Sequence, residues 1–121
     1  MDEQKDDKVD SLEMALRALT VMFVEKLPGK LLEMETALNQ LVQNKDDPET
    51  LNLLYRLLHT MAGSAGTFGF DEIGLEARAL EARLKPLLAG GTWSDAELTQ
   101  FSSDVSSYLA ASLRIAKDKA P

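Results

Sequence analysis

Apolar residues recur at spacings of three and four along most of the chain, which is the period of helices that bury one face. The longest run of this kind consists of Leu12, Leu16, Leu19, Phe23, Leu27, Leu31, Met34, Leu38 and Leu41. It predicts one long helix over residues 11–44. Residues 1–9 are charged and lack the pattern, so we expect them to be disordered.

Two features mark this first helix. Asp10 and Ser11 are typical N-cap residues, and Glu13 completes a capping-box-like arrangement, so the helix is expected to begin there. Pro28 lies inside the apolar run. Because proline removes a backbone hydrogen bond and clashes with the carbonyl four residues earlier, it predicts a kinked helix, with two shorter helices as the alternative.

Two more helices follow after a polar turn. Asp47 and Pro48 together form a start signal for a helix over residues 48–67. Asp71 is then expected to cap a third helix, which the pair Gly90–Gly91 should end. The core face of this third helix consists of Ile73, Ala77, Leu80, Leu84 and Leu87.

The fourth helix has the clearest start in the chain. Ser94 and Glu97 fit a capping box, and Trp93 and Leu98 occupy the two positions of a hydrophobic staple. Its apolar face continues with Phe101, Val105, Tyr108, Leu109 and Ser112.

These elements predict an all-α fold. No segment of useful length alternates like a β-strand, and short connections between amphipathic helices favour an antiparallel, up-down-up-down four-helix bundle. We expect the bundle to cover residues 10–116, with a long, Pro-kinked first helix or an extra N-terminal helix. Residues 117–121 are expected to be a tail or linker.

Composition narrows the class of protein. A chain of 121 residues suits one domain, and its formal net charge of -7 argues against nucleic acid as a partner. The absence of cysteine excludes disulfides, thiolate catalysis and cysteine-ligated metals. There is no membrane-spanning run and no signal-peptide pattern, so we expect a cytoplasmic protein that does not bind membranes. The partner is expected to be another protein.

The single histidine of the chain, His59, stands out on the second helix. On a helical wheel it lies about 120° from the apolar stripe, towards water. Its neighbours at +3, +4 and +7 are Ala62, Gly63 and Gly66, none longer than a methyl group. A glycine inside a helix costs about 1 kcal/mol relative to alanine. We therefore interpret this bare surface as clearance for a partner, the alternative being that the glycines simply end the helix, with Gly69 as a left-handed cap.

The run from His59 to Phe70 resembles the signature of histidine-containing phosphotransfer (HPt) domains, in which a histidine precedes small residues and often Thr-Phe-Gly. The resemblance extends from about residue 19 to residue 113. It implies a four-helix bundle that serves two-component phosphorelays. One departure is Ala62, because members commonly carry a lysine there.

The function that this resemblance implies fits the chemistry of a lone imidazole. A neutral imidazole is a nucleophile near neutral pH, so His59 is expected to accept a phosphoryl group from an aspartyl-phosphate receiver domain and pass it to another. A histidine kinase is a further candidate partner. The chain has no ATP-binding motif, so we expect a phosphocarrier rather than an enzyme, with no cofactor of its own and Mg²⁺ on the partner receiver domain.

Other site residues are weaker candidates. The resemblance places the carboxylate of Glu81 near the histidine, where it would orient the imidazole and fix its tautomer. Tyr55 and Arg56, one turn before His59, join Ala62, Gly63 and Gly66 as candidates for partner docking. Ser64 is expected to bond back to a helix carbonyl instead.

Four other functions were compared. A chemotaxis-type kinase has a histidine-bearing substrate domain that also resembles this region, and an adaptor bundle would bind partners without phosphorylation. Both stay open. Asp10-Ser11-Leu12 matches the prosthetic-group site of acyl carrier proteins but stands too near the start of the chain. A diiron bundle needs more than the one histidine present.

Overall fold

The structure is a computed structural model that describes the backbone of residues 2–119 and the side chains of residues 8–118. The chain forms four α-helices, and no strand occurs between residues 2 and 119. Their bounds are α1 Asp2–Gln43, α2 Pro48–Ala65, α3 Asp71–Leu88 and α4 Asp95–Lys119, with a short 3₁₀ turn, η1, over Gly66–Phe68. The all-α prediction is confirmed.

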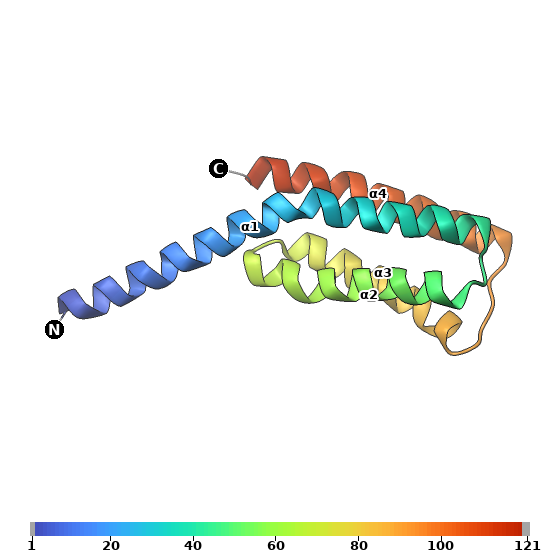
Figure 1. Cartoon of the computed structure of the whole chain (residues 1–121), viewed down its shortest axis with the longest axis horizontal. Helices are drawn as coiled ribbons and strands as arrows, with labels where there is room; N and C mark the ends of the chain where they lie inside the picture. The colour runs from blue at the N-terminus through green and yellow to red at the C-terminus, as the bar shows by residue number, and fades with distance from the viewer. Residues whose placement is uncertain (1, 120–121) are drawn as a thin grey trace.

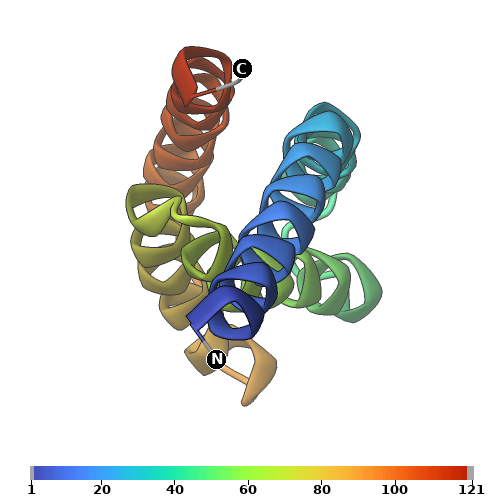
Figure 2. The ribbon, with the colours of Figure 1, turned by 90° about the vertical axis from the view of Figure 1, so that its left-hand side faces the viewer.

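The helices run antiparallel. Figure 1 shows the chain reversing direction at each connection, with α1 and α4 on one side of the bundle and α2 and α3 on the other. The end-on view in Figure 2 shows α1 and α4 diverging towards the top of the picture, with the N-terminal part of α1 crossing in front of the other helices. This is the expected up-down-up-down four-helix bundle.

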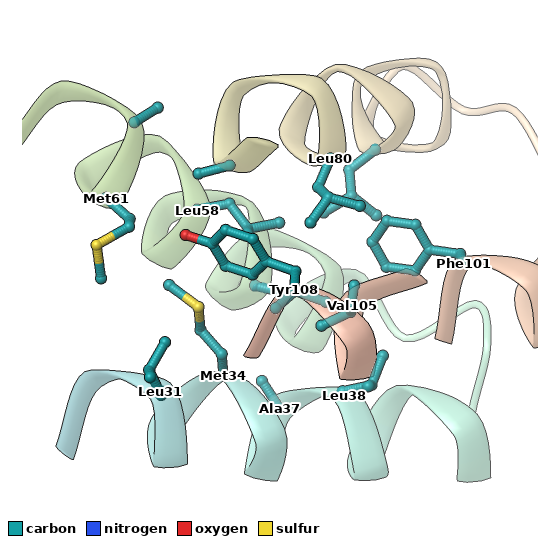
Figure 3. Packing of buried hydrophobic residues seen from close by; sticks show 14 of the residues in the cluster. Leu31, Met34, Ala37, Leu38, Leu58, Met61, Leu80, Phe101, Val105 and Tyr108 are labelled. Carbon is teal, nitrogen blue, oxygen red and sulfur yellow. The ribbon is translucent and has the colours of Figure 1, made fainter. Parts of the chain in front are cut away.

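The core is apolar and draws on every helix (Figure 3). Met34, Leu58, Leu84 and Val105, one from each helix, are all completely buried. Burying a side chain of this size stabilises the fold by about 1.5–3 kcal/mol. The core therefore holds α2 and α3 rigidly in place relative to α1 and α4.

A buried hydrogen bond also joins α4 to α3. The hydroxyl of Tyr108 donates to the backbone carbonyl of Ile73, at an O···O distance of 3.2 Å. Burial raises the pKa of the Tyr108 hydroxyl well above its usual range, because the interior disfavours the charged phenolate.

The helix ends follow the expected signals in most places. The backbone N–H of Ser94 and the carboxylate of Glu97, and the N–H of Glu97 and the hydroxyl of Ser94, each lie 3.1 Å apart, so the predicted capping box is confirmed. Gly69 has a φ of 85°, the left-handed conformation expected of it. Asp71 is wrong as a cap: the N-cap is Phe70, and Asp71 is the first helical residue. The second helix was expected to run to residue 67, but α2 ends at Ala65, and residues 66 and 67 belong to the 3₁₀ turn η1.

The start of α1 is the largest departure from expectation. The helix begins at Asp2, not near residue 11, so residues 2–9 are helical where disorder was expected. Asp10, Ser11 and Glu13 lie in its interior and form no cap. The physical reason is that no glycine or proline occurs before Pro28, so nothing in the sequence stops the helix.

The first and last helices, α1 and α4, are both longer than predicted. The alternative of two helices divided at Pro28 is wrong, because α1 is continuous through it. Figure 1 shows α1 bending along its length, as a helix with an internal proline should. At the other end α4 continues to Lys119, so residues 117–119 of the expected tail are helical. Residues 120 and 121 lie outside the described part.

The N-terminal part of α1 projects beyond the bundle (Figure 1). Leu12, Leu16 and Leu19, expected in the core, are 70%, 50% and 49% exposed, and burial of the apolar stripe is complete only from Leu27. Phe23 lies at the boundary and packs its ring against Phe68 and Phe70, with centroids 5.2 and 5.3 Å away. Periodicity reports that a helix is amphipathic, but it does not say whether another element reaches far enough to cover it.

No helix in the described part of the chain is long and apolar enough to cross a membrane.

Candidate functional site

The packing of α2 decides where His59 points. Leu51, Leu54, Leu58 and Ala65 form the buried stripe of this helix. His59 lies off that stripe, and its side chain is 67% exposed. The imidazole is therefore open to water and to another protein, while its backbone stands on a rigid helix.

Glu81 on α3 is buried, with 6% of its surface exposed, and it contacts the histidine directly. The distance between His59 Nδ1 and Glu81 Oε2 is 2.9 Å. Because an ionised carboxylate only accepts hydrogen bonds, this contact assigns the proton of the neutral imidazole to Nδ1. The lone pair is then on Nε2, the ring nitrogen that Glu81 does not contact.

Tyr55 also restrains the imidazole, by packing against one face of the ring. It precedes His59 by one helical turn, and the two rings stack with a centroid distance of 5.8 Å and an interplanar angle of 14°. Tyr55 is half-buried and covers one face of the imidazole. A candidate for partner docking is thus found in contact with the histidine itself.

The opposite side of the imidazole is open. A Cβ atom added at Gly63, one turn after His59, would have nothing within 4 Å. Packing therefore does not require a glycine at this position, and the helix accepts its cost of about 1 kcal/mol without a steric reason inside the molecule. This observation supports the interpretation of Gly63 as clearance for a partner.

The other candidate residues lie in different surroundings. Ala62 is buried rather than part of an open surface, with 9% exposed, while Gly66 and Arg56 are exposed. A Cβ at Gly66 would lie 3.6 Å from a carboxylate oxygen of Asp71. The hydroxyl of Ser64 donates to the carbonyl of Thr60 at 2.9 Å, the structural role expected of it.

Gly74 on α3 is a residue that our sequence analysis missed. A Cβ there would lie 3.4 Å from both the Ala62 carbonyl oxygen and the Gly66 nitrogen, which is tighter than most contacts. The glycine lets the backbones of α2 and α3 approach closely beside the site. Its signal in the sequence was a glycine inside a helical pattern, which often marks close packing.

The arrangement suits a nucleophile in a phosphoryl transfer. A carboxylate on Nδ1 makes Nε2 more electron-rich and stabilises the positive charge that the ring gains when Nε2 forms a bond. A flat, exposed, oriented ring can reach a phosphorus atom held by another protein.

Comparisons with known proteins found both a matching family and a similar protein. The Hpt domain family matches residues 18–112 of this chain. The chain is also similar to the chemotaxis protein CheA of Rhizobium meliloti (strain 1021), with 32% identity over 71 residues, or 59% of this chain and 9% of that protein. No solved structure matches the chain. The family match covers most of the four-helix bundle and includes both His59 and Glu81, so the chain belongs to the Hpt domain family.

Proposed function

We propose that this protein is a phosphorelay intermediate, which accepts a phosphoryl group on His59 from one receiver domain and delivers it to another. The observation that carries the proposal is the contact of 2.9 Å between Nδ1 of His59 and the buried carboxylate of Glu81, which leaves Nε2 as a nucleophile in the open. Membership of the Hpt domain family supports the same chemistry.

The transfer step needs no proton to leave the ring. The lone pair of Nε2 attacks phosphorus, the Nε2–P bond forms, and the P–O bond of the aspartyl phosphate breaks, with its electron pair leaving on the aspartate carboxylate. The Nδ1 proton stays in its hydrogen bond to Glu81, whose negative charge balances the new positive charge of the ring. Delivery to the next receiver is the reverse of this step on a different aspartate.

The partner completes the site. His59 and Glu81 supply a nucleophile and its orientation, and the receiver domain is expected to supply Mg²⁺ and the groups that bind the phosphoryl oxygens. In this proposal the protein is a phosphocarrier and not an enzyme on its own.

The experiment is transfer of ³²P from a panel of phosphorylated receiver domains to this protein. We expect an acid-labile, alkali-stable label on the wild type and none on His59→Gln. Since His59 is the only histidine, no other imidazole can take the label. Label that survives the substitution, or no transfer from any receiver of the same genome, would contradict the proposal.

A second candidate function is favoured by the similarity to a protein named for chemotaxis. In it, this bundle is the histidine-bearing substrate domain of a kinase, and His59 receives its phosphoryl group from ATP bound to a separate domain. Mixing the protein with the ATP-binding domain of a chemotaxis-type kinase distinguishes the two. Labelling by that domain and ATP, without any receiver, would favour the kinase function over the relay.

A binding-only adaptor is the remaining alternative. It predicts that a receiver domain binds wild-type protein and His59→Gln alike, and that neither becomes labelled. The same ³²P experiment, followed by a pull-down with the unphosphorylated receiver, separates this outcome from the relay.

A further inference from the structure

Arg78 on α3 is a basic residue near the site. It has no part in the packing of the core or in the transfer step proposed above. It is exposed, and it forms no hydrogen bond or ion pair with any of residues 8–118. Its counterpart on the same helix, Arg83, is by contrast paired with Asp104 at 2.6 Å. Arg78 is thus a cation for which this part of the protein provides no anion.

The register of α2 against α3 places Arg78 about one helical turn from the level of the histidine. Glu81 contacts His59, and the backbone of Gly74 lies against Ala62 and Gly66. Residues Gly74, Arg78 and Glu81 are spaced by four and three, so they share the edge of α3 that faces α2. Arg78 lies between the two contacts that fix this register.

The same register gives the level of Arg78 along α2. The helices are antiparallel, and Arg78 precedes Glu81 by three residues, so it is level with the residue three positions after His59, which is Ala62. Neither Ala62 nor its neighbour Gly63 carries a charge or a long side chain. Ala62 is buried, but the space beside Gly63 is open, and an arginine side chain spans about one helical turn, so it can reach towards the imidazole.

The two faces of the imidazole differ in how open they are, and Arg78 lies on the open side. Lys85, the basic residue on the other side of Glu81, is level with Tyr55, whose ring covers that face of the imidazole. Arg78 is on the side of Gly63, where nothing lies within 4 Å of an added Cβ. A phosphoryl group arriving at Nε2 through the open side therefore meets Arg78 before any other cation on this edge of α3.

We propose that Arg78 binds the phosphoryl group on Nε2 of His59, from α3, through its guanidinium. This inference rests on the proposed function, because it needs His59 to be phosphorylated. A phosphohistidine carries up to two negative charges on three oxygens, and guanidinium presents paired N–H donors that match two of them. Glu81 and Arg78 then act on the two parts of one group: the carboxylate holds the positive ring, and the guanidinium holds the negative phosphoryl oxygens.

The test uses phosphoramidate, a small phosphoryl donor that needs no receiver domain, on the full chain. The midpoint of the second phosphoryl ionisation is measured by ³¹P NMR during a pH titration. A bound cation favours the dianion and lowers this midpoint, so Arg78→Ala should raise it by about half a pH unit, the size expected of an exposed ion pair. The difference should shrink at high salt, and Arg78→Lys should keep most of the effect.

A matched control is Arg114→Ala, which removes the same charge from an exposed position on α4. We expect its midpoint to equal that of the wild type. An unchanged midpoint in Arg78→Ala, or an equal shift in Arg114→Ala, would overturn the role of Arg78 while leaving phosphorylation of His59 intact. If phosphoramidate and every receiver fail to label His59, the proposed function falls, and this inference falls with it.

Discussion

The two edges of α3 make a useful comparison, because one helix carries charged residues on both. On the edge that faces α4, Arg83 donates to Asp104 at 2.6 Å and lies over the ring of Phe101, with its guanidinium carbon 5.1 Å from the ring centroid. On the edge that faces α2, Glu81 contacts a histidine whose other nitrogen stays exposed, and Arg78 forms no ion pair with residues 8–118.

The comparison distinguishes charged residues that stabilise the fold from charged residues that take part in the proposed transfer. Arg83 and Asp104 neutralise each other's charge within the molecule, so the pair gives no reason to expect a further ligand. The His59–Glu81 pair uses Nδ1 of the ring and leaves Nε2 without a contact to Glu81, so Nε2 stays available for the proposed transfer. We therefore expect changes on the α2 edge to alter phosphotransfer with little loss of fold, and changes on the α4 edge to do the reverse.

The largest expected effect is that of Glu81→Ala. Removing the carboxylate frees the tautomer and rotation of the imidazole and takes away the charge that balances the phosphorylated ring. We expect the initial rate of transfer from a phosphorylated receiver to fall by about tenfold or more, by analogy with groups that orient a reactive histidine. Glu76→Ala, an exposed glutamate on α3, is the control and should keep the wild-type rate. A rate for Glu81→Ala within twofold of wild type would make this carboxylate a bystander.

A smaller effect is expected from Gly63→Leu. A Cβ at this position has nothing within 4 Å, and leucine favours the helix by nearly 1 kcal/mol over glycine, so the melting temperature should rise slightly. The transfer rate should nevertheless fall by about fivefold, because one misplaced contact at the reacting centre is costly. Gly29→Leu is the matched control, since this helical glycine also has open space around its Cβ. Equal rates in both variants would remove the argument for clearance.

On the α4 side, Tyr108→Phe should change stability and not transfer. The substitution removes the hydrogen bond to the Ile73 carbonyl, and a bond of this kind contributes about 1 kcal/mol. For a domain of this size the melting temperature should fall by about 4 °C. Circular dichroism measures the change. A wild-type melting temperature combined with slow transfer would reverse the comparison.

The smallest expected effect belongs to the Arg83–Asp104 pair. Hydrogen bonds from Arg83, and then from Gln100, hold the pKa of Asp104 below its usual range. Because the folded-state pKa is depressed, the stabilisation is present above the unfolded-state pKa and is lost as the pH falls through the folded one. The wild type should therefore melt slightly above Asp104→Asn at pH 7 and together with it in strong acid. A difference that grows on acidification would contradict this linkage.

Much of the fold follows from local patterns in the sequence. The apolar period identified four helices, and the Ser94–Glu97 capping box placed the start of α4 correctly. Gly69 has the expected left-handed conformation, although it caps η1 and not α2. The exposure of His59 also followed from its angle to the stripe of Leu51, Leu54 and Leu58. These features depend on a few residues close together in the chain.

Features that depend on distant residues were harder to predict. Leu12, Leu16 and Leu19 have the spacing of core residues, yet no element extends far enough to cover them. The positions of Gly74 and Arg78 near the site depend on the register of α3 against α2, and no local sequence pattern gives this register. The position of Glu81 next to His59 was expected only because the sequence resembles a known family.

The role assigned to the His59–Glu81 pair can be tested by identifying which ring nitrogen carries phosphorus. Two-dimensional ¹H–¹⁵N NMR of protein phosphorylated by a receiver domain distinguishes the two nitrogens of its single histidine. We expect phosphorus on Nε2 and a proton on Nδ1, held by Glu81. Phosphorus on Nδ1 would require that contact to break, and it would contradict the role assigned to the His59–Glu81 pair.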